Sequence, residues 1–234
     1  MQVLRCLTVI VQRIVLFVGL VLSLSHWRHA LFKSEHSPLR RSIIHSFSFL
    51  ASHCANVPPI SALEFHSRQR ALAEVLHTLD VAAYIAEPGA NALFFGNISA
   101  TQWSLSERPL LLIISPEVID GIVHPKISIV TPTFESTRAK LLPISSENVA
   151  FLEWPEDSSP YETAVSAFSG RKGNVYVDGM MRKFVADGLA AAAPSRKVLS
   201  APLEVMSLRQ RKSPAEIRLL RCANEVNATQ IEDV

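Results

Sequence analysis

The segment Leu110-Leu111-Leu112-Ile113-Ile114 consists only of aliphatic residues. Such a short, unbroken apolar run predicts a strand that is covered on both faces of a sheet. Further strands are predicted at residues 81–86, 127–130, 148–154, 175–177 and 198–201, and helices at 61–80, 133–141, 161–168 and 179–193. This alternation predicts an α/β fold with a mixed, mostly parallel sheet of about six strands flanked by helices.

Two helices are predicted to begin at capping boxes, in which a serine and a glutamate three residues apart satisfy each other's free backbone N–H groups. The first box pairs Ser61 with Glu64, and the second pairs Ser213 with Glu216. Pro214 occupies the first helical position of the second box, where a helix tolerates proline well. This second helix is predicted to extend to about residue 231. Its apolar residues are Ile217, Leu220 and Val226.

The composition is that of a globular protein, because 48% of the 234 residues are hydrophobic and 19% are charged. These proportions exclude a mostly disordered chain. Lys and Arg number 23 and Asp and Glu 21, for a formal net charge of +2, so no nucleic-acid partner is expected. The cysteines, Cys6, Cys54 and Cys222, are too few and too scattered to predict a disulfide scaffold or a zinc ribbon.

The N-terminal segment has the features of a targeting sequence. Residues 1–34 contain no acidic residue, and Arg5 and Arg13 precede an apolar stretch at 14–22. That length fits the core of a signal peptide, so residues 1–25 are interpreted as a signal peptide or signal anchor and 26–59 as a linker. We therefore expect entry into the secretory pathway, with the chain secreted or membrane-anchored. A mitochondrial presequence is the alternative, because the segment is basic and is followed by serine-rich sequence.

Two acceptor triplets for N-linked glycosylation agree with the secretory interpretation. They are Asn97-Ile98-Ser99 and Asn227-Ala228-Thr229. Asn97 is the stronger candidate because it is expected in a polar turn.

Common catalytic and cofactor-binding motifs are absent from the sequence. It has no Gly-x-Gly dinucleotide loop, no Gly-x-x-x-x-Gly-Lys phosphate loop and no Gly-x-Ser-x-Gly nucleophile elbow. His124 is the last histidine, so no later residue offers an imidazole. Asp178 is interpreted as the N-cap of the following helix rather than as a base, and residues 170–173 as a turn. No catalytic and no metal-binding residue is assigned.

Four blocks of sequence are more distinctive. They are Glu-Pro-Gly-Ala-Asn-Ala-Leu-Phe-Phe at 87–95, Trp-Ser-Leu-Ser-Glu-Arg-Pro at 103–109, Val-Asp-Gly-Met-Met-Arg at 177–182 and Leu-Arg-Gln-Arg-Lys-Ser-Pro-Ala-Glu at 208–216. Over residues 60–234 the chain resembles the N-terminal domain of the creatinase/prolidase/aminopeptidase P-type (pita-bread) metallopeptidases, and most closely their fungal, membrane-associated branch. The resemblance implies a creatinase-type α/β domain at 60–205. It also implies, at 206–234, a connector and the first helix of a catalytic domain that this chain lacks.

The family implied by this resemblance is a group of hydrolases that cleave proline-containing peptides. Two divalent metal ions (manganese, cobalt or zinc) are held by two Asp, one His and two Glu of the catalytic domain. None of these ligands can be assigned here, so no cofactor and no activity are expected for this chain by itself.

The resemblance therefore implies a non-catalytic domain of a truncated or partial peptidase, one that shapes the substrate entrance and makes subunit contacts in a homo-oligomer. Trp103 and Arg108 are the candidates for this surface, whereas Phe94 and Phe95 fit a core position better. Contact with a membrane is expected only through the N-terminal segment. A second interpretation stays open, namely a stand-alone secreted or membrane-tethered binding or dimerisation module without peptidase activity.

Overall fold

The computed structural model describes residues 54–146 and 148–232. The expected leader at 1–25 and most of the expected linker at 26–59 lie outside the described residues. None of the helices in the described ranges is long and apolar enough to cross a membrane. The chain divides into two compact units, one formed by Pro59–Ile217 and the other by the segments on either side of it.

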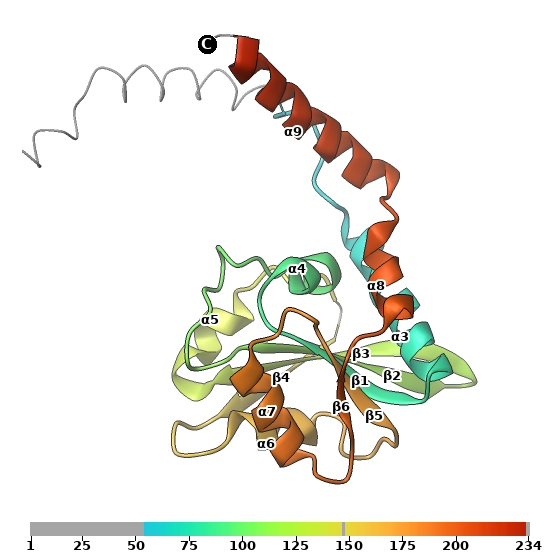
Figure 1. Ribbon diagram of the computed structural model, residues 1–234, viewed down its shortest axis with the longest axis vertical. Helices are drawn as coiled ribbons and strands as arrows, with labels where there is room; N and C mark the ends of the chain where they lie inside the picture. Colours follow the sequence, from blue (N-terminus) through green and yellow to red (C-terminus); the bar gives the residue numbers. More distant parts are fainter. Residues whose placement is uncertain (1–53, 147, 233–234) are drawn as a thin grey trace, which may run out of the picture. The chain divides into compact units, whose positions relative to one another are not determined.

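Helices and strands alternate along the chain, as the sequence predicts (Figure 1). The elements are α3 Ala62–Thr78, β1 Val81–Ala86, α4 Ala90–Gly96, β2 Leu111–Ile119, β3 Ile122–Pro132, the 3-10 turn η2 Thr133–Glu135, α5 Ser136–Lys140, β4 Val149–Trp154, α6 Pro160–Ser166, β5 Asn174–Val177, α7 Lys183–Ala192, β6 Val198–Ser200, α8 Leu203–Gln210 and α9 Pro214–Glu232.

The six strands form one mixed sheet in the order β4-β3-β2-β1-β5-β6. The pairs β3–β4, β1–β5 and β5–β6 are parallel, whereas β1–β2 and β2–β3 are antiparallel. The predicted fold class, a mixed and mostly parallel α/β sheet, is therefore confirmed.

The antiparallel pairing of β2 with β3 forms a long hairpin that was not predicted from the sequence. The sequence predicts two separate short strands at 110–114 and 127–130. In the structure, β2 and β3 pair continuously from Leu111↔Val130 to Ile119↔Ile122. The connection consists of Asp120 and Gly121, which both have positive φ. Asp-Gly is a preferred pair for such two-residue hairpin turns, because both positions require this backbone conformation.

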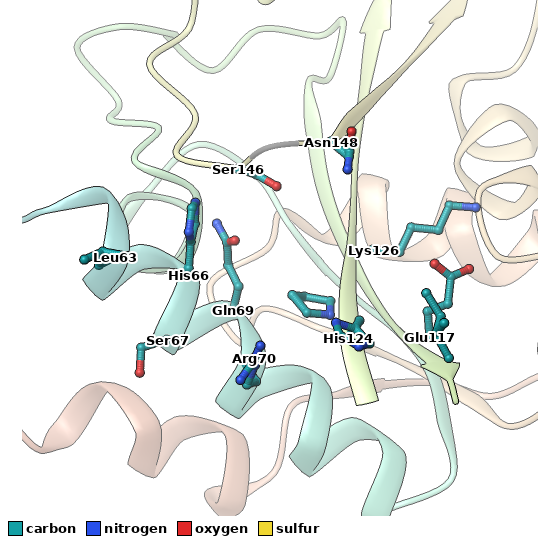
Figure 2. Close-up of a pocket in the computed structure, with 12 residues that line it drawn as sticks. Leu63, His66, Ser67, Gln69, Arg70, Glu117, His124, Lys126, Ser146 and Asn148 are labelled. Atoms are coloured by element: carbon teal, nitrogen blue, oxygen red, sulfur yellow. The ribbon is translucent and has the colours of Figure 1, made fainter. Parts of the chain in front are cut away.

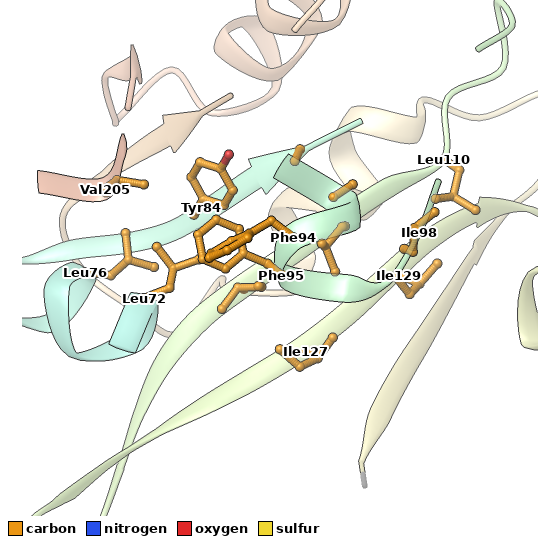
Figure 3. Close-up of a cluster of buried hydrophobic side chains, with 14 of the residues drawn as sticks. Leu72, Leu76, Tyr84, Phe94, Phe95, Ile98, Leu110, Ile127, Ile129 and Val205 are labelled. Carbon is orange, nitrogen blue, oxygen red and sulfur yellow. The ribbon is translucent and has the colours of Figure 1, made fainter. Parts of the chain in front are cut away.

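Helices cover both faces of the sheet (Figure 1). On one face, Leu72 and Leu76 of α3, Phe95 of α4 and Val205 of α8 pack with the buried strand residues Leu112, Ile114, Ile127 and Ile129 (Figure 3). On the other face, Ala164 of α6 and Val185 and Leu189 of α7 pack with Ile85, Leu111, Ile113 and Val130. Successive residues of β2 therefore face opposite layers, which confirms that the aliphatic run is covered on both sides.

Glycine permits one close helix contact in the second layer. A Cβ atom built on Gly188 of α7 would lie 2.2 Å from the ring of Tyr161 on α6. A larger residue at position 188 would therefore displace the Tyr161 ring.

The second capping box forms both predicted hydrogen bonds, whereas in the first box the structure shows the bond to the serine hydroxyl and the Glu64 carboxylate pairs with Arg68 instead. The backbone N–H of Glu64 donates to the Ser61 hydroxyl at 3.2 Å. In the second box, Ser213 and Glu216 each accept a hydrogen bond from the other's backbone N–H, at 3.1 and 3.0 Å.

Two local predictions are corrected, and helix α4 at residues 90–96 was not predicted. The connector expected from residue 206 lies partly within helix α8, which extends to Gln210. Asp178 is not a helix N-cap, because α7 starts at Lys183 with Arg182 in the N-cap position. The side chain of Asp178 instead accepts the backbone N–H of Met180 at 3.0 Å, which closes a turn before the helix.

Candidate functional site

Two of the distinctive sequence blocks meet at the ends of neighbouring parallel strands. Glu87 directly follows β1 and Asp178 directly follows β5, and these parallel strands pair up to Ile85↔Val177. The carboxyl ends of adjacent parallel strands are where α/β folds commonly place functional side chains. The blocks at 87–95 and 177–182, which lie far apart in sequence, therefore form one polar cluster.

The first interaction of this cluster is a buried ion pair between Glu87 and Arg182. The guanidinium donates from Nε and Nη2 to Oε1 of Glu87, at 3.0 and 2.6 Å. The backbone N–H of Arg182 donates to the other carboxylate oxygen at 2.9 Å. The Arg182 side chain is 28% exposed and that of Glu87 only 6%. This arrangement uses both oxygens of the carboxylate to hold the start of α7 at the end of β1.

The second interaction joins Asn91 of α4 to Asp178. Nδ2 of Asn91 donates to Oδ1 of Asp178 at 2.8 Å, and the Asp178 carboxylate is buried. Both buried acids of the cluster thus have internal hydrogen-bond donors, so they connect α4, α7 and the strand ends. This geometry gives the cluster an architectural role.

Two tyrosines beside the cluster are shifted by their surroundings. Burial raises the pKa of Tyr84 far above its ordinary value, and the neighbouring Asp178 carboxylate raises it further. Arg209 and a hydrogen bond with Asn91 act in the opposite direction. Burial, and then the charge of Glu87, also raise the pKa of Tyr161.

We predict that the protein loses stability at alkaline pH through Tyr84. Above pH 10.0, the ordinary tyrosine value, the unfolded chain ionises this group while the folded chain keeps its proton. The free energy of unfolding is then expected to fall by about 1.4 kcal/mol per pH unit for this tyrosine. Urea unfolding of the unchanged chain and of Tyr84→Phe, between about pH 9 and about pH 11, measures the effect. The slope should be shallower in the variant, and equal slopes would contradict the prediction.

Trp103, one of the two surface candidates, is buried. Its side chain is 2% exposed and belongs to the core below α3 and α4. The Arg138 guanidinium lies 4.2 Å from its ring centroid, over the indole, and donates a hydrogen bond to the carbonyl of Gln102. Trp103 therefore supports the loop before β2 from inside.

Arg108, the other candidate, lies on the surface. Its side chain is 46% exposed and forms an ion pair with Glu156 at 3.1 Å, and its guanidinium lies 5.3 Å from the centroid of the Phe134 ring. Phe94 and Phe95 are both buried and pack edge to face with centroids 4.9 Å apart, as the core interpretation predicts. Arg108 is thus the one of these four side chains that a partner could reach.

The acceptor residue Asn97 lies at the C-cap of α4 with left-handed backbone. Its Nδ2 donates to the carbonyl oxygen of Pro143 at 2.8 Å. Asn227 lies within α9. Glycosylation at either position stays a prediction, and at Asn97 it requires the loss of this hydrogen bond.

Arg68 is an interaction centre that the sequence analysis missed. It forms ion pairs with Glu64 and, at 3.4 Å, with Glu216. It also donates to the carbonyl of Phe94 at 3.1 Å and lies 4.1 Å from the centroid of that ring. Arg68 therefore links α3, α4 and the capping box of α9. Of these interactions, the sequence could indicate only the ion pair with Glu64, because residues four apart on a helix are neighbours.

A groove of about 610 Å³ lies between α3 and the first half of β3 (Figure 2). His66 and Arg70 of α3 line one side, and His124 and Lys126 of β3 line the other. His124 and Lys126 alternate along the strand with Pro125 and Ile127, and Ile127 faces the α3 layer. His124 and Lys126 thus share the face of the strand that points away from α3, so they do not converge on one point with His66 and Arg70.

The described residues do not fit a metal centre. No group of three or more His, Cys, Asp or Glu side chains among them is placed to hold a metal ion. The two-metal site of the resembling family therefore has no counterpart in the described part of this chain.

Comparison with known proteins adds one relative in sequence and several in structure. No family model matches the chain. An uncharacterized peptidase of Schizosaccharomyces pombe is 35% identical over 173 residues, which cover 73% of this chain and 38% of the relative. The dipeptidase PepE from Mycobacterium ulcerans matches with a TM-score of 0.56 at 20% identity, over 69% of this chain and 40% of that one. A prolidase from Thermococcus sibiricus matches with a TM-score of 0.52 at 13% identity, over the same shares.

The chain thus spans about two fifths of the length of each of these proteins. The described domain has the fold of the N-terminal domain of creatinase/prolidase-type dipeptidases.

Proposed function

We propose that this chain acts as the non-catalytic N-terminal domain of a proline-directed metallo-aminopeptidase or dipeptidase. The observation that carries the proposal is the share of the relatives that it covers: 38% of a peptidase from Schizosaccharomyces pombe and 40% of a dipeptidase and of a prolidase. In this proposal the two divalent metal ions, manganese, cobalt or zinc, and the peptide-cleaving residues belong to a second domain. This chain contributes the shape of the substrate entrance and contacts between subunits.

Exposed apolar residues near the C-terminal end support a contact with a further domain. Leu203 and Met206 lie three residues apart on α8 and are both exposed, while Val205 between them is buried in the core. Ile217 and Leu220 are exposed in the same way on α9. Burying exposed apolar side chains of this kind against a partner is favourable, because it removes their apolar surface from water.

Arg108 is the residue we propose for the entrance or the subunit contact. It is exposed, and one nitrogen of its guanidinium pairs with Glu156, which is itself exposed. The other N–H donors of the guanidinium suit recognition of a carboxylate, such as the C-terminus of a short peptide or an acidic side chain of a second subunit.

We predict that the purified chain does not hydrolyse Xaa-Pro peptides, with or without added manganese, because the described residues hold no metal-binding set. A chimera provides the positive control. In it, the 173-residue segment of this chain that matches the Schizosaccharomyces pombe relative replaces the corresponding segment of that protein. We expect the chimera to keep any Xaa-Pro hydrolysis that the unmodified relative has. Metal-dependent turnover that co-purifies with the chain alone would overturn the proposal.

The same chimera tests Arg108. Arg108→Ala is expected to raise KM or to shift the oligomeric state, whereas Lys183→Ala, which removes a cation from an exposed pair with Asp187, should change neither. Equal behaviour of the two variants would remove Arg108 from the proposed contact.

A secreted or membrane-tethered binding or dimerisation module is the second candidate function. The groove beside β3 favours it, because neither Arg70 nor Lys126 has an ion-pair partner among the described residues. Stable self-association of the chain, together with a chimera that fails to assemble, would favour this candidate. For either function we propose residence in the secretory pathway, with mitochondria as the alternative.

A further inference from the structure

A disulfide bond joins Cys54 to Cys222, which lie 168 residues apart in sequence. Their Cα atoms are 5.9 Å apart, within the range that a disulfide spans. Both cysteines belong to the compact unit that is built from the segments on either side of Pro59–Ile217. The bond therefore encloses the whole sheet-bearing unit within one covalent loop of the main chain.

Each cysteine is placed in local structure that supports the bond. Cys222 lies on α9 and is buried. Cys54 lies in a turn that is closed by a hydrogen bond from the backbone N–H of Val57 to its carbonyl oxygen, at 3.0 Å. Residues 54–58 have no other covalent attachment to α9, so the bond fixes this short segment on the helix.

We infer that Cys54 and Cys222 form a redox-dependent clasp, closed in an oxidising compartment and opened by reduction. The oxidant is another disulfide, of a small thiol such as glutathione or of an oxidoreductase. One cysteine thiolate attacks it and releases a thiol, and the second cysteine displaces the remaining thiol from the mixed disulfide. In sum, two cysteine thiols lose two protons and two electrons, and the oxidant is reduced to two thiols.

The clasp changes the chain in two ways. When Pro59–Ile217 unfolds, the closed loop leaves the unfolded chain fewer conformations, so the oxidised form resists unfolding better than the reduced form. When the main chain is cut anywhere between the two cysteines, the two pieces stay joined until the bond is reduced. The closed form also fits the secretory pathway, where such bonds persist, better than the cytosol, where thiols are kept reduced.

The full chain, produced once in the secretory pathway of a host cell and once in a reducing cytosol, tests the inference. Limited trypsin cleavage within the loop is followed by gel electrophoresis with and without reductant, and peptide mapping identifies the linked cysteines. We expect one band without reductant and two bands with it for the secreted chain, with Cys54 linked to Cys222. The cytosolic chain should give two bands in both lanes.

Variants separate this pairing from the alternatives. Cys6→Ser should leave the linked pieces unchanged, whereas the double change Cys54→Ser with Cys222→Ser should separate them without reductant. If the double variant does not fold, reduction of the unchanged chain provides the same comparison. Complete alkylation of Cys54 and Cys222 in the unreduced secreted chain, or a link from either one to Cys6, would overturn the inference.

Discussion

Replacing Glu87 by alanine is expected to lower the free energy of unfolding by about 2–4 kcal/mol, below the upper range for broken buried pairs because Arg182 is partly exposed. The carboxylate accepts three hydrogen bonds from Arg182, two of them from the guanidinium. Its removal leaves both the guanidinium and the backbone N–H at the start of α7 without their acceptor. Urea unfolding at neutral pH measures the loss as a lower midpoint at unchanged slope.

An exposed ion pair on α7, the helix that Arg182 precedes, provides the control. Lys183 and Asp187 are as close as Glu87 and Arg182, with N–O distances of 2.7 and 2.6 Å, but their side chains are 86% and 62% exposed. Asp187→Ala should therefore cost no more than about 0.5 kcal/mol. Glu87→Gln keeps the shape and one acceptor oxygen, so it should fall between the two alanine variants. Equal losses for Glu87→Ala and Asp187→Ala would show that burial does not decide the strength of this pair.

The Glu87–Arg182 pair also shows what the sequence could not predict. The strand before Glu87 was predicted with its exact bounds at 81–86, because six apolar residues stand between Asp80 and the sequence Glu87-Pro88. The partner of Glu87 lies 95 residues away. That pairing depends on β5 lying beside β1, and strand order is a property of the whole sheet that no local pattern contains.

Local signals succeeded where the chemistry is local. Both helices begin where the capping boxes predict, with the serine hydroxyl accepting the backbone N–H of the glutamate, because each box is complete within four residues. The Asp120-Gly121 turn was equally local, and its signal for a hairpin was present in the sequence. It was missed because the apolar runs at 110–114 and 127–130 are shorter than the strands, whose outer parts are held by pairing with each other rather than by burial.

The surface candidates were separated only by the structure. Trp103 and Arg108 belong to one sequence block, yet the indole is covered by Arg138 while the guanidinium of Arg108 is exposed. Whether such a side chain is buried depends on residues far away in the sequence that pack against it. Arg138 lies on α5, beyond the β2–β3 hairpin in sequence, so the block itself could not reveal the cover.

Replacing Arg68 by alanine is the second change for which we expect a large effect, a loss of about 3–4 kcal/mol in the free energy of unfolding. The side chain is 10% exposed and faces two carboxylates, those of Glu64 and Glu216, which are 20% and 18% exposed. Without the guanidinium, these two like charges lose their shared cation. The Phe94 ring also loses the planar group that covers it at 4.1 Å.

Variants of the same helix show which property of Arg68 matters. Arg70→Ala is the control, because Arg70 lies two residues along α3, is exposed and has no ion-pair partner among the described residues; it should cost no more than about 0.5 kcal/mol. Arg68→Lys keeps the charge but not the planar stacking or the forked donors, so we expect an intermediate loss.

Hydrogen exchange distinguishes a local from a general effect of Arg68→Ala. Glu216 both accepts the backbone N–H of Ser213 and pairs with Arg68, so the variant should also loosen the start of α9. The amides of residues 216 and 217, which are bonded to Ser213, should exchange faster than those of β1 under native conditions. Unchanged protection of these two amides, together with a loss of stability no larger than that of Arg70→Ala, would contradict a linking role for Arg68. A large loss with unchanged local protection would place its contribution in the packing on Phe94 instead, because the contact with Phe94 joins α3 to α4 and does not involve α9.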